Sequence, residues 1–206
     1  MTSPLPSPAK IGAVILAAGA SQRLGQPKQL VSVSGKPMLA RTIEAALAIP
    51  RLWPVVVVLG ARAEQIRPVV VPHPVLIVEN AAWAEGMASS LRLGLTTVEA
   101  FQHHIPAVLF TLCDQPGLTP ATLHELVETY DRSHASLVAA RYDGHLGAPA
   151  LLRREHFAHL HQLVGDEGAR QLFARVPSEQ IASIERPELA FDLDTPGDLA
   201  RLHASS

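Results

Sequence analysis

The chain has 206 residues, of which 48% are hydrophobic, 17% charged and 4% aromatic, so it fits a globular domain with an aliphatic core. Its 17 basic and 19 acidic residues give a formal net charge of −2, which argues against nucleic acid and anionic membranes as partners. The single cysteine, Cys113, excludes an internal disulfide and a cysteine-based zinc site, and it favours a reducing compartment.

The N-terminal segment 1–10 combines three prolines with three Ser or Thr residues, and we expect it to form a flexible tail. It lacks the charged start and apolar stretch of a signal peptide. No run reaches the roughly 18 apolar residues that a membrane span needs. We therefore expect a cytoplasmic protein in which residues 11–206 form a single domain.

Short apolar runs rich in branched residues alternate with longer segments of helical periodicity. The first run, 11–16, shows no polar alternation, which is typical of a strand buried on both faces. Further strands are predicted at 55–59, 75–78, 107–112, 136–140 and near 180–184, and helices at 37–49, 63–70, 87–100, 120–132 and near 153–163. The stretch 143–152 contains Gly and Pro and is predicted to be a loop.

This alternation predicts an α/β fold with a mostly parallel sheet and helices on both of its faces. Ligands of such sheets bind at the carboxyl ends of the strands. The loops that follow Leu16, Val78 and Leu112 are therefore the candidate binding loops.

The loop after the first strand reads LAAGASQRLGQPKQL over residues 16–30. Its small residues Ala17, Ala18 and Gly19 let backbone N–H groups approach a polyanion. Arg23 and Lys28 add two cations, so the loop is a candidate triphosphate site. Its spacing differs from that of the GxxxxGK[ST] and GxGxxG loops. The alternative is a simple strand-to-helix connection with solvated cations.

Carboxylates follow the strand 107–112 and lie near the end of the chain. Asp114 stands at a strand tip, where a carboxylate is costly unless something binds it, and Mg²⁺ takes one or two carboxylates together with substrate phosphates. Asp192 and Asp194 are two residues apart, so an extended segment directs both to one face. The alternatives are that Asp114 caps a turn and that Asp194 or Thr195 caps the helix begun by Pro196.

The pattern L-A-A-G-x-S-x-R-x-G-x-x-K, followed by GKPML, resembles the signature of nucleotidyltransferases with a Rossmann-like, single-domain α/β fold. The segments N-x-x-W-x-E-G-M-x-S-S-L-x-x-G-L and CDQP are similar to those of the molybdenum cofactor cytidylyltransferase family. The resemblance extends from residue 11 to about residue 202. It implies transfer of a nucleotide from CTP to molybdopterin, which yields molybdopterin cytosine dinucleotide and pyrophosphate.

The resemblance also implies roles for individual residues. The nucleotide would be bound by the first loop at Leu16, Ala17, Ala18 and Gly19. Ser90 would lie against the base, and Asp114 would also bind the nucleotide. Arg23 and Lys28 would be the catalytic cations. Asp114 and Asp194 would hold Mg²⁺, with Mn²⁺ as a substitute.

The acceptor region is expected to include Gly147, Pro149, Arg170 and Asp192. The Gly-His-Pro of the family stands here as Gly147, Ala148 and Pro149, which leaves the acceptor open. Partners implied are CTP, molybdopterin and, transiently, a molybdenum hydroxylase client or its chaperone. The alternatives are a guanylyltransferase of the same fold, a transferase acting on another phosphorylated acceptor, and a non-catalytic protein that carries molybdopterin to its client.

Overall fold

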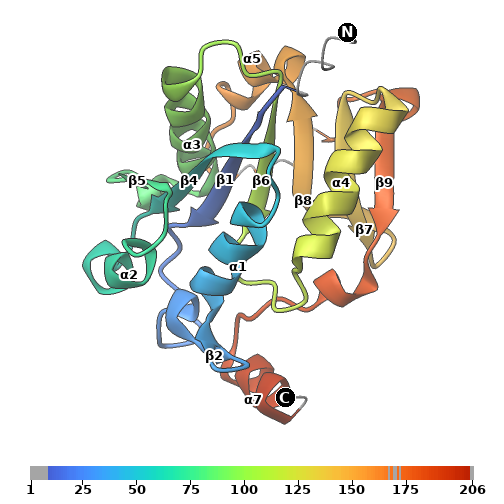
Figure 1. Ribbon diagram of the computed structural model, residues 1–206. Coiled ribbons are helices and arrows are strands. Elements are labelled where there is room, and N and C mark those ends of the chain that lie inside the picture. The colour runs from blue at the N-terminus through green and yellow to red at the C-terminus, as the bar shows by residue number, and fades with distance from the viewer. Residues whose placement is uncertain (1–8, 167, 169–170, 172, 205–206) are drawn as a thin grey trace, which may run out of the picture.

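The computed structural model describes residues 9–166, 168, 171 and 173–204. Seven strands form one sheet in the order β5–β4–β1–β6–β8–β7–β9 (Figure 1). Their bounds are β1 (Ile11–Ala17), β4 (Leu52–Leu59), β5 (Leu76–Glu79), β6 (Ala107–Leu112), β7 (Leu137–Tyr142), β8 (His145–Arg153) and β9 (Ile181–Glu185). Neighbouring strands are parallel except where β8 pairs with β6 and β7, so the prediction of a mostly parallel sheet is confirmed. A separate hairpin joins β2 (Ser32–Val33) to β3 (Lys36–Pro37).

Helices cover both faces of the sheet, as predicted (Figure 1). On one face Ile15 of β1 belongs to the same core cluster as Leu39 and Leu123, and on the other Val14 packs in a cluster with Leu91. The α-helices are α1 (Met38–Leu47), α2 (Ala63–Val70), α3 (Met87–Phe101), α4 (Pro120–Ser133), α5 (Phe157–Leu160) and α7 (Pro196–Ala204). The 3-10 helices are η1 (Lys28–Leu30), η2 (Trp83–Glu85), η3 (Arg154–His156), η4 (Ser178–Gln180) and η5 (Pro187–Ala190).

The prediction of a loop at 143–152 is wrong, because most of this stretch forms β8, which inserts antiparallel between β6 and β7. The β7–β8 register shifts between Ala139 and Ala140, and Pro149 lies on β8 opposite this irregularity. A bulge tolerates a proline because the residue there need not donate to the ladder. The helix predicted near 153–163 is also shorter, since it consists of η3 and α5.

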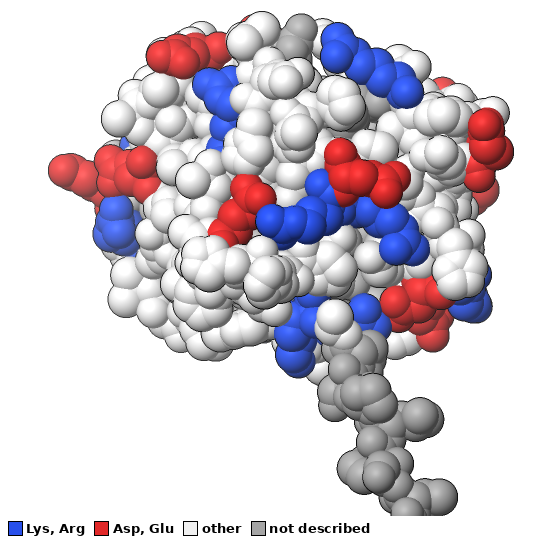
Figure 2. All heavy atoms as spheres, turned by 90° about the horizontal axis from the view of Figure 1, so that it is seen from above, with Lys and Arg blue, Asp and Glu red and all other residues white. Residues whose placement is uncertain are grey.

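The carboxyl ends of β1, β4 and β6 meet at one edge of the sheet, the lower edge in Figure 1. The segment before α7 docks at this edge, where the N–H of buried Leu193 donates to the carbonyl of Asp114 (2.9 Å). Figure 2 shows the opposite face, on which basic and acidic side chains are interspersed. No helix among the residues that the structure describes is long and apolar enough to cross a bilayer.

Candidate active site

Two adjoining cavities open at the carboxyl edge of the sheet. The first, of about 630 Å³, lies between the loop after β1, the start of α3 and the end of β6. The second, of about 570 Å³, extends towards β8. Both are of the size that holds a small-molecule ligand. Residues that line both include Arg23, Lys28, Asp114, Asp166 and Asp194, so these side chains stand where the two cavities join.

The loop after β1 is braced from within the fold by Gln29. This side chain is 1% exposed, and its amide donates to the carbonyls of Ala17 (2.8 Å) and Gly19 (3.0 Å). The Lys28 N–H donates to Ser21 Oγ (3.1 Å), which closes the loop. Leu16, Ala17, Ala18 and Gly19 all line the first cavity. The predicted nucleotide loop therefore borders the cavity in a fixed backbone conformation.

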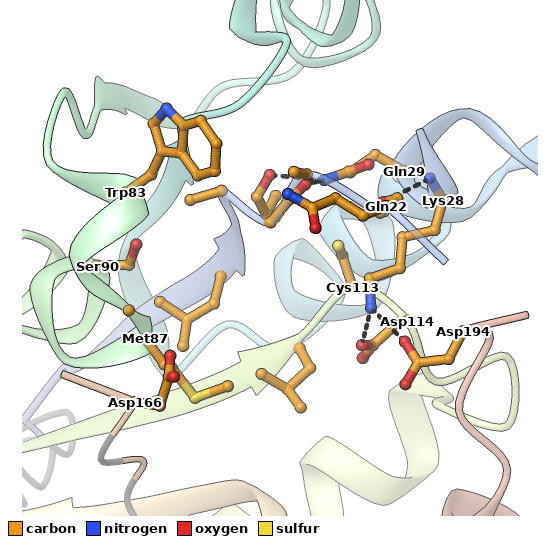
Figure 3. Close-up of a pocket in the computed structure, with 18 of the residues that line it drawn as sticks. Gln22, Lys28, Gln29, Trp83, Met87, Ser90, Cys113, Asp114, Asp166 and Asp194 are labelled. Carbon is orange, nitrogen blue, oxygen red and sulfur yellow. Dashed lines mark hydrogen bonds and ion pairs between the residues drawn. The ribbon is translucent and has the colours of Figure 1, made fainter. Parts of the chain in front are cut away.

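Four charged side chains from three parts of the sequence meet where the cavities join. Figure 3 shows three of them, Lys28, Asp114 and Asp194, pointing toward one another. Lys28 Nζ lies 2.6 Å from Asp114 Oδ2 and 3.0 Å from Asp194 Oδ1. Arg23 Nη2 lies 2.9 Å from Asp194 Oδ2. The sequence marked each of these residues separately, and the structure places them in one ion-paired cluster.

Burial opposes the charge on Lys28, whose side chain is 15% exposed. The carboxylates of Asp114 and then Asp194 outweigh this effect and raise the pKa of Lys28 well above its ordinary value. Lys28 is therefore a fixed cation at physiological pH.

This raised pKa fixes the pH range in which the pairing stabilises the fold. A group whose pKa is higher in the folded state contributes its full stabilisation below the unfolded value, about 10.4 for lysine, and loses it as the pH rises through the folded value. We compare the free energy of unfolding of the wild type with that of Lys28→Met. The stabilisation that Lys28 adds should be constant from about pH 7 to 9 and should shrink above about pH 10. Urea denaturation at several pH values measures it; shrinkage already below pH 9 would contradict this assignment.

The two carboxylates suit a metal ion that also binds phosphate. Asp114 Oδ1 is buried and has no hydrogen-bond partner within the described part of the chain. An oxygen in this position costs free energy unless a donor or a cation reaches it. The described residues contain no group of three or more His, Cys, Asp or Glu that would hold a metal alone. Mg²⁺ needs only one or two carboxylates when substrate phosphates complete its shell, so Asp114 and Asp194 fit it.

In the segment before α7, the two aspartates face the cavities and a different residue caps the helix. Leu193 is fully buried, whereas Asp192 lines the second cavity and Asp194 lines both. Thr195 Oγ1 accepts from the N–H of Asp198 (3.2 Å), and Asp198 Oδ2 accepts from the N–H of Thr195 (2.8 Å). Thr195 thus caps α7, as one alternative held, while the Asp194 carboxylate faces Lys28 and Arg23.

The far side of the first cavity carries a buried polar network. Ser90 is 5% exposed and lines this cavity, and its Oγ accepts from Asn80 Nδ2 (2.9 Å). The second Asn80 N–H goes to Ser89 Oγ (2.8 Å), which donates to the carbonyl of Gly86 (2.8 Å). The Ser90 hydroxyl hydrogen has no acceptor among the residues described, so it is available to a ligand.

The second cavity is lined by both apolar and polar residues. Its wall includes Asp192, Ala148 and the side chains of Leu91, Phe110, Tyr142 and Phe173. Gly147 lies against the Tyr142 ring, and a Cβ at this position would overlap the phenol. Gly147 and Pro149, predicted for the acceptor region, do not line this cavity, whereas Ala148 between them does. Arg170 lies outside the described residues.

Sequence reasoning missed two residues of the site. Gln29 carried no signal, because its carbonyl partners are defined only by the folded loop. Asp166 was not among the predicted site residues, yet it lines both cavities. Its GDEG context marks a turn, but the distant helix against which it docks is not visible in the sequence.

Cys113 is expected to be chemically inert, although it lines the first cavity. It is 2% exposed; burial raises the pKa of its thiol to about 12, and the Asp114 charge adds to this effect. Since the thiolate is the nucleophile, iodoacetamide at about pH 8 should leave native protein unlabelled and should label the urea-unfolded chain. Mass spectrometry measures both; equal labelling rates in the two states would contradict the expectation.

A loop of small residues and cations at a strand end, beside two carboxylates, is typical of nucleotidyltransferases. The chain matches the MobA-like NTP transferase domain over residues 13–181, and it belongs to this family. The family resemblance seen in the motifs is thereby confirmed.

Known relatives differ in the activities that their names state. The chain is 35% identical over 166 residues to nicotine blue oxidoreductase of Paenarthrobacter nicotinovorans, covering 80% of this chain and 75% of the relative. It is 28% identical over 192 residues to a probable molybdenum cofactor guanylyltransferase of Trichormus variabilis, covering 91% and 88%.

Solved structures confirm the fold. The crystal structure of Rv0371c from Mycobacterium tuberculosis superposes with a TM-score of 0.78 at 29% identity, covering 96% of this chain and all of that chain. A structure of Rv0371c in complex with manganese gives a TM-score of 0.75 at 27% identity, with coverage of 96% and 100%.

Proposed function

We propose that this protein transfers the cytidylyl group of CTP to the terminal phosphate of molybdopterin, forming molybdopterin cytosine dinucleotide and pyrophosphate. The observation that carries the proposal is the cluster of Lys28, Arg23, Asp114 and Asp194 at the junction of two cavities. The nucleotide occupies the first cavity and the acceptor the second, so the reacting phosphates meet at these charges.

The reaction is an in-line displacement at the α-phosphorus of CTP. A phosphate oxygen of the acceptor forms the new P–O bond, the bond to the bridging oxygen of the β-phosphate breaks, and pyrophosphate leaves with the electron pair. The attacking phosphate is already anionic near neutral pH, so the step needs no general base. Catalysis then consists of positioning and of stabilising charge.

Each charged side chain has a defined task in this scheme. Lys28, held protonated, turns from the carboxylates to the phosphates and offsets their charge together with Arg23. Asp114 and Asp194 would hold Mg²⁺, or Mn²⁺ as a substitute, and this ion would supply Lewis-acid stabilisation of phosphate oxygens. The manganese in the Rv0371c structure supports a divalent cation in this family.

Ser90 supports CTP as the nucleotide. Its hydroxyl lines the first cavity and is available as a donor, and cytosine offers two adjacent acceptors, O2 and N3. A guanylyltransferase is the second candidate, supported by the 28% identical relative of that name. The product would be delivered in the cytoplasm to a molybdenum hydroxylase or its chaperone.

Transfer of label from CTP to the acceptor tests this function. With CTP labelled at the α-phosphate, purified protein, Mg²⁺ and molybdopterin, the label should move to the molybdopterin product at the rate of pyrophosphate release. No electron donor is added, so turnover reports nucleotidyl transfer and not the redox chemistry named for the Paenarthrobacter relative. Binding of molybdopterin without label transfer from any nucleoside triphosphate would refute the catalytic function and favour a carrier.

A further inference from the structure

The segment that carries Asp166 is fastened to the first two turns of α3. Arg92 donates to the carbonyl of Leu163, and the N–H of Ala88 donates to the carbonyl of Gly165 (3.0 Å). Gly86, with a φ of 107°, lies so close to Gly165 that a Cβ on it would overlap the Gly165 carbonyl. These contacts fix the backbone directly before Asp166.

Asp166 lies on the same side of the first cavity as Ser90. Figure 3 shows Ser90, Met87 and Asp166 on this side, across the cavity from the Lys28 cluster. The Asp166 side chain lines the cavity, and the position that a Cβ on Gly86 would take lies beside its carboxylate. The Asp166 carboxylate therefore borders both cavities on the side opposite the Lys28 cluster, which is also the side of Ser90, the group that contacts the base in the proposed function.

Ser90 and Asp166 together present one donor and one acceptor to a ligand. Cytosine carries two acceptors, O2 and N3, beside an amino donor at N4, which is complementary to this pair. Uracil places a carbonyl where cytosine has its amino group, so it would set an acceptor against the carboxylate. Carboxylates accept from the cytosine amino group in other recognition sites as well.

Resting on the proposed function, we propose that Asp166 determines base specificity by accepting a hydrogen bond from the exocyclic amino group of CTP. Loss of a hydrogen bond to a charged acceptor weakens the binding affinity by about 10-fold to 100-fold. For UTP the carboxylate acts as a repulsive element, which widens the difference between the two nucleotides. Gly86 is a positioning residue that allows the Asp166 segment to dock.

Equilibrium binding of CTP and UTP by titration calorimetry, with Mg²⁺ and without acceptor, tests the proposal. The wild type should prefer CTP by about 10-fold to 100-fold. Asp166→Asn should reduce this preference to a few-fold, because an amide presents an acceptor to cytosine or a donor to uracil. The matched control Asp143→Asn, which removes an equal charge at the exposed β7–β8 turn, should keep the full preference.

A second variant tests the role of docking. Gly86→Ala displaces Gly165 and should lower the CTP preference, while binding of inorganic triphosphate stays as in the wild type. Full CTP preference in Asp166→Asn would overturn the inference and leave the proposed function standing. Preference of the wild type itself for GTP, or equal binding of CTP and UTP, would instead overturn the choice of CTP, and the inference with it.

Discussion

Replacing Asp114 with Asn should lower kcat for CTP-dependent pyrophosphate release by about 10²-fold to 10³-fold, the usual cost of removing one preorganised charge from a transition state. Asn keeps the size of the side chain but removes the charge that pairs with Lys28 (2.6 Å) and the buried Oδ1 available to a metal. The loss should be larger in kcat than in KM, because the nucleotide retains its loop and Ser90 contacts.

Asp143→Asn is the matched control for this substitution as well, since it lies at the β7–β8 turn and lines neither cavity. It should keep wild-type kinetics. Steady-state assays of both variants at saturating CTP provide the comparison. A kcat for Asp114→Asn within threefold of the wild type would remove Asp114 from the catalytic centre.

Lys28→Met should lower kcat to a similar extent, about 10²-fold to 10³-fold, and should tighten the binding of Mn²⁺ in the absence of nucleotide by about tenfold or more. The Lys28 ammonium contacts Asp114 and Asp194, the oxygens that a metal ion would use. Because its pKa is raised, Lys28 stays protonated, and deprotonation does not free the two carboxylates for a metal ion. Removing it leaves two carboxylates close together with less opposing charge, which attracts a dication.

Electron paramagnetic resonance of free Mn²⁺ measures this affinity. The control Lys36→Met removes a cation that pairs with Glu44 on the protein surface and should leave Mn²⁺ binding unchanged. Weaker Mn²⁺ binding by Lys28→Met than by the wild type would show that the carboxylates do not form the metal site.

The sequence predicted the parts of the fold that are governed by local periodicity. The run at 11–16 lacks polar alternation because β1 is covered by helices on both faces. The region of β8 was mispredicted because Gly147 and Pro149 interrupt its apolar pattern, and only pairing with β6 and β7 makes it a strand.

The candidate site was predictable where its chemistry lies in a short motif. Arg23, Lys28 and Asp114 stand in loops directly after or close to buried strands, so the edge of the sheet brings them together. Supporting residues were harder to identify. Asp166 lines the site only because Gly86, which precedes it by many residues, has no side chain.

The rate of pyrophosphate release with molybdopterin and Mg²⁺, compared among CTP, GTP, ATP and UTP, tests the central claim most directly. We expect release with CTP to exceed that with the other three, and to be lost in Asp114→Ala. A preference for GTP would contradict the cytidylyltransferase assignment and place the protein with the guanylyltransferases. No release with any of the four, despite demonstrated binding of molybdopterin, would contradict a catalytic role with this acceptor.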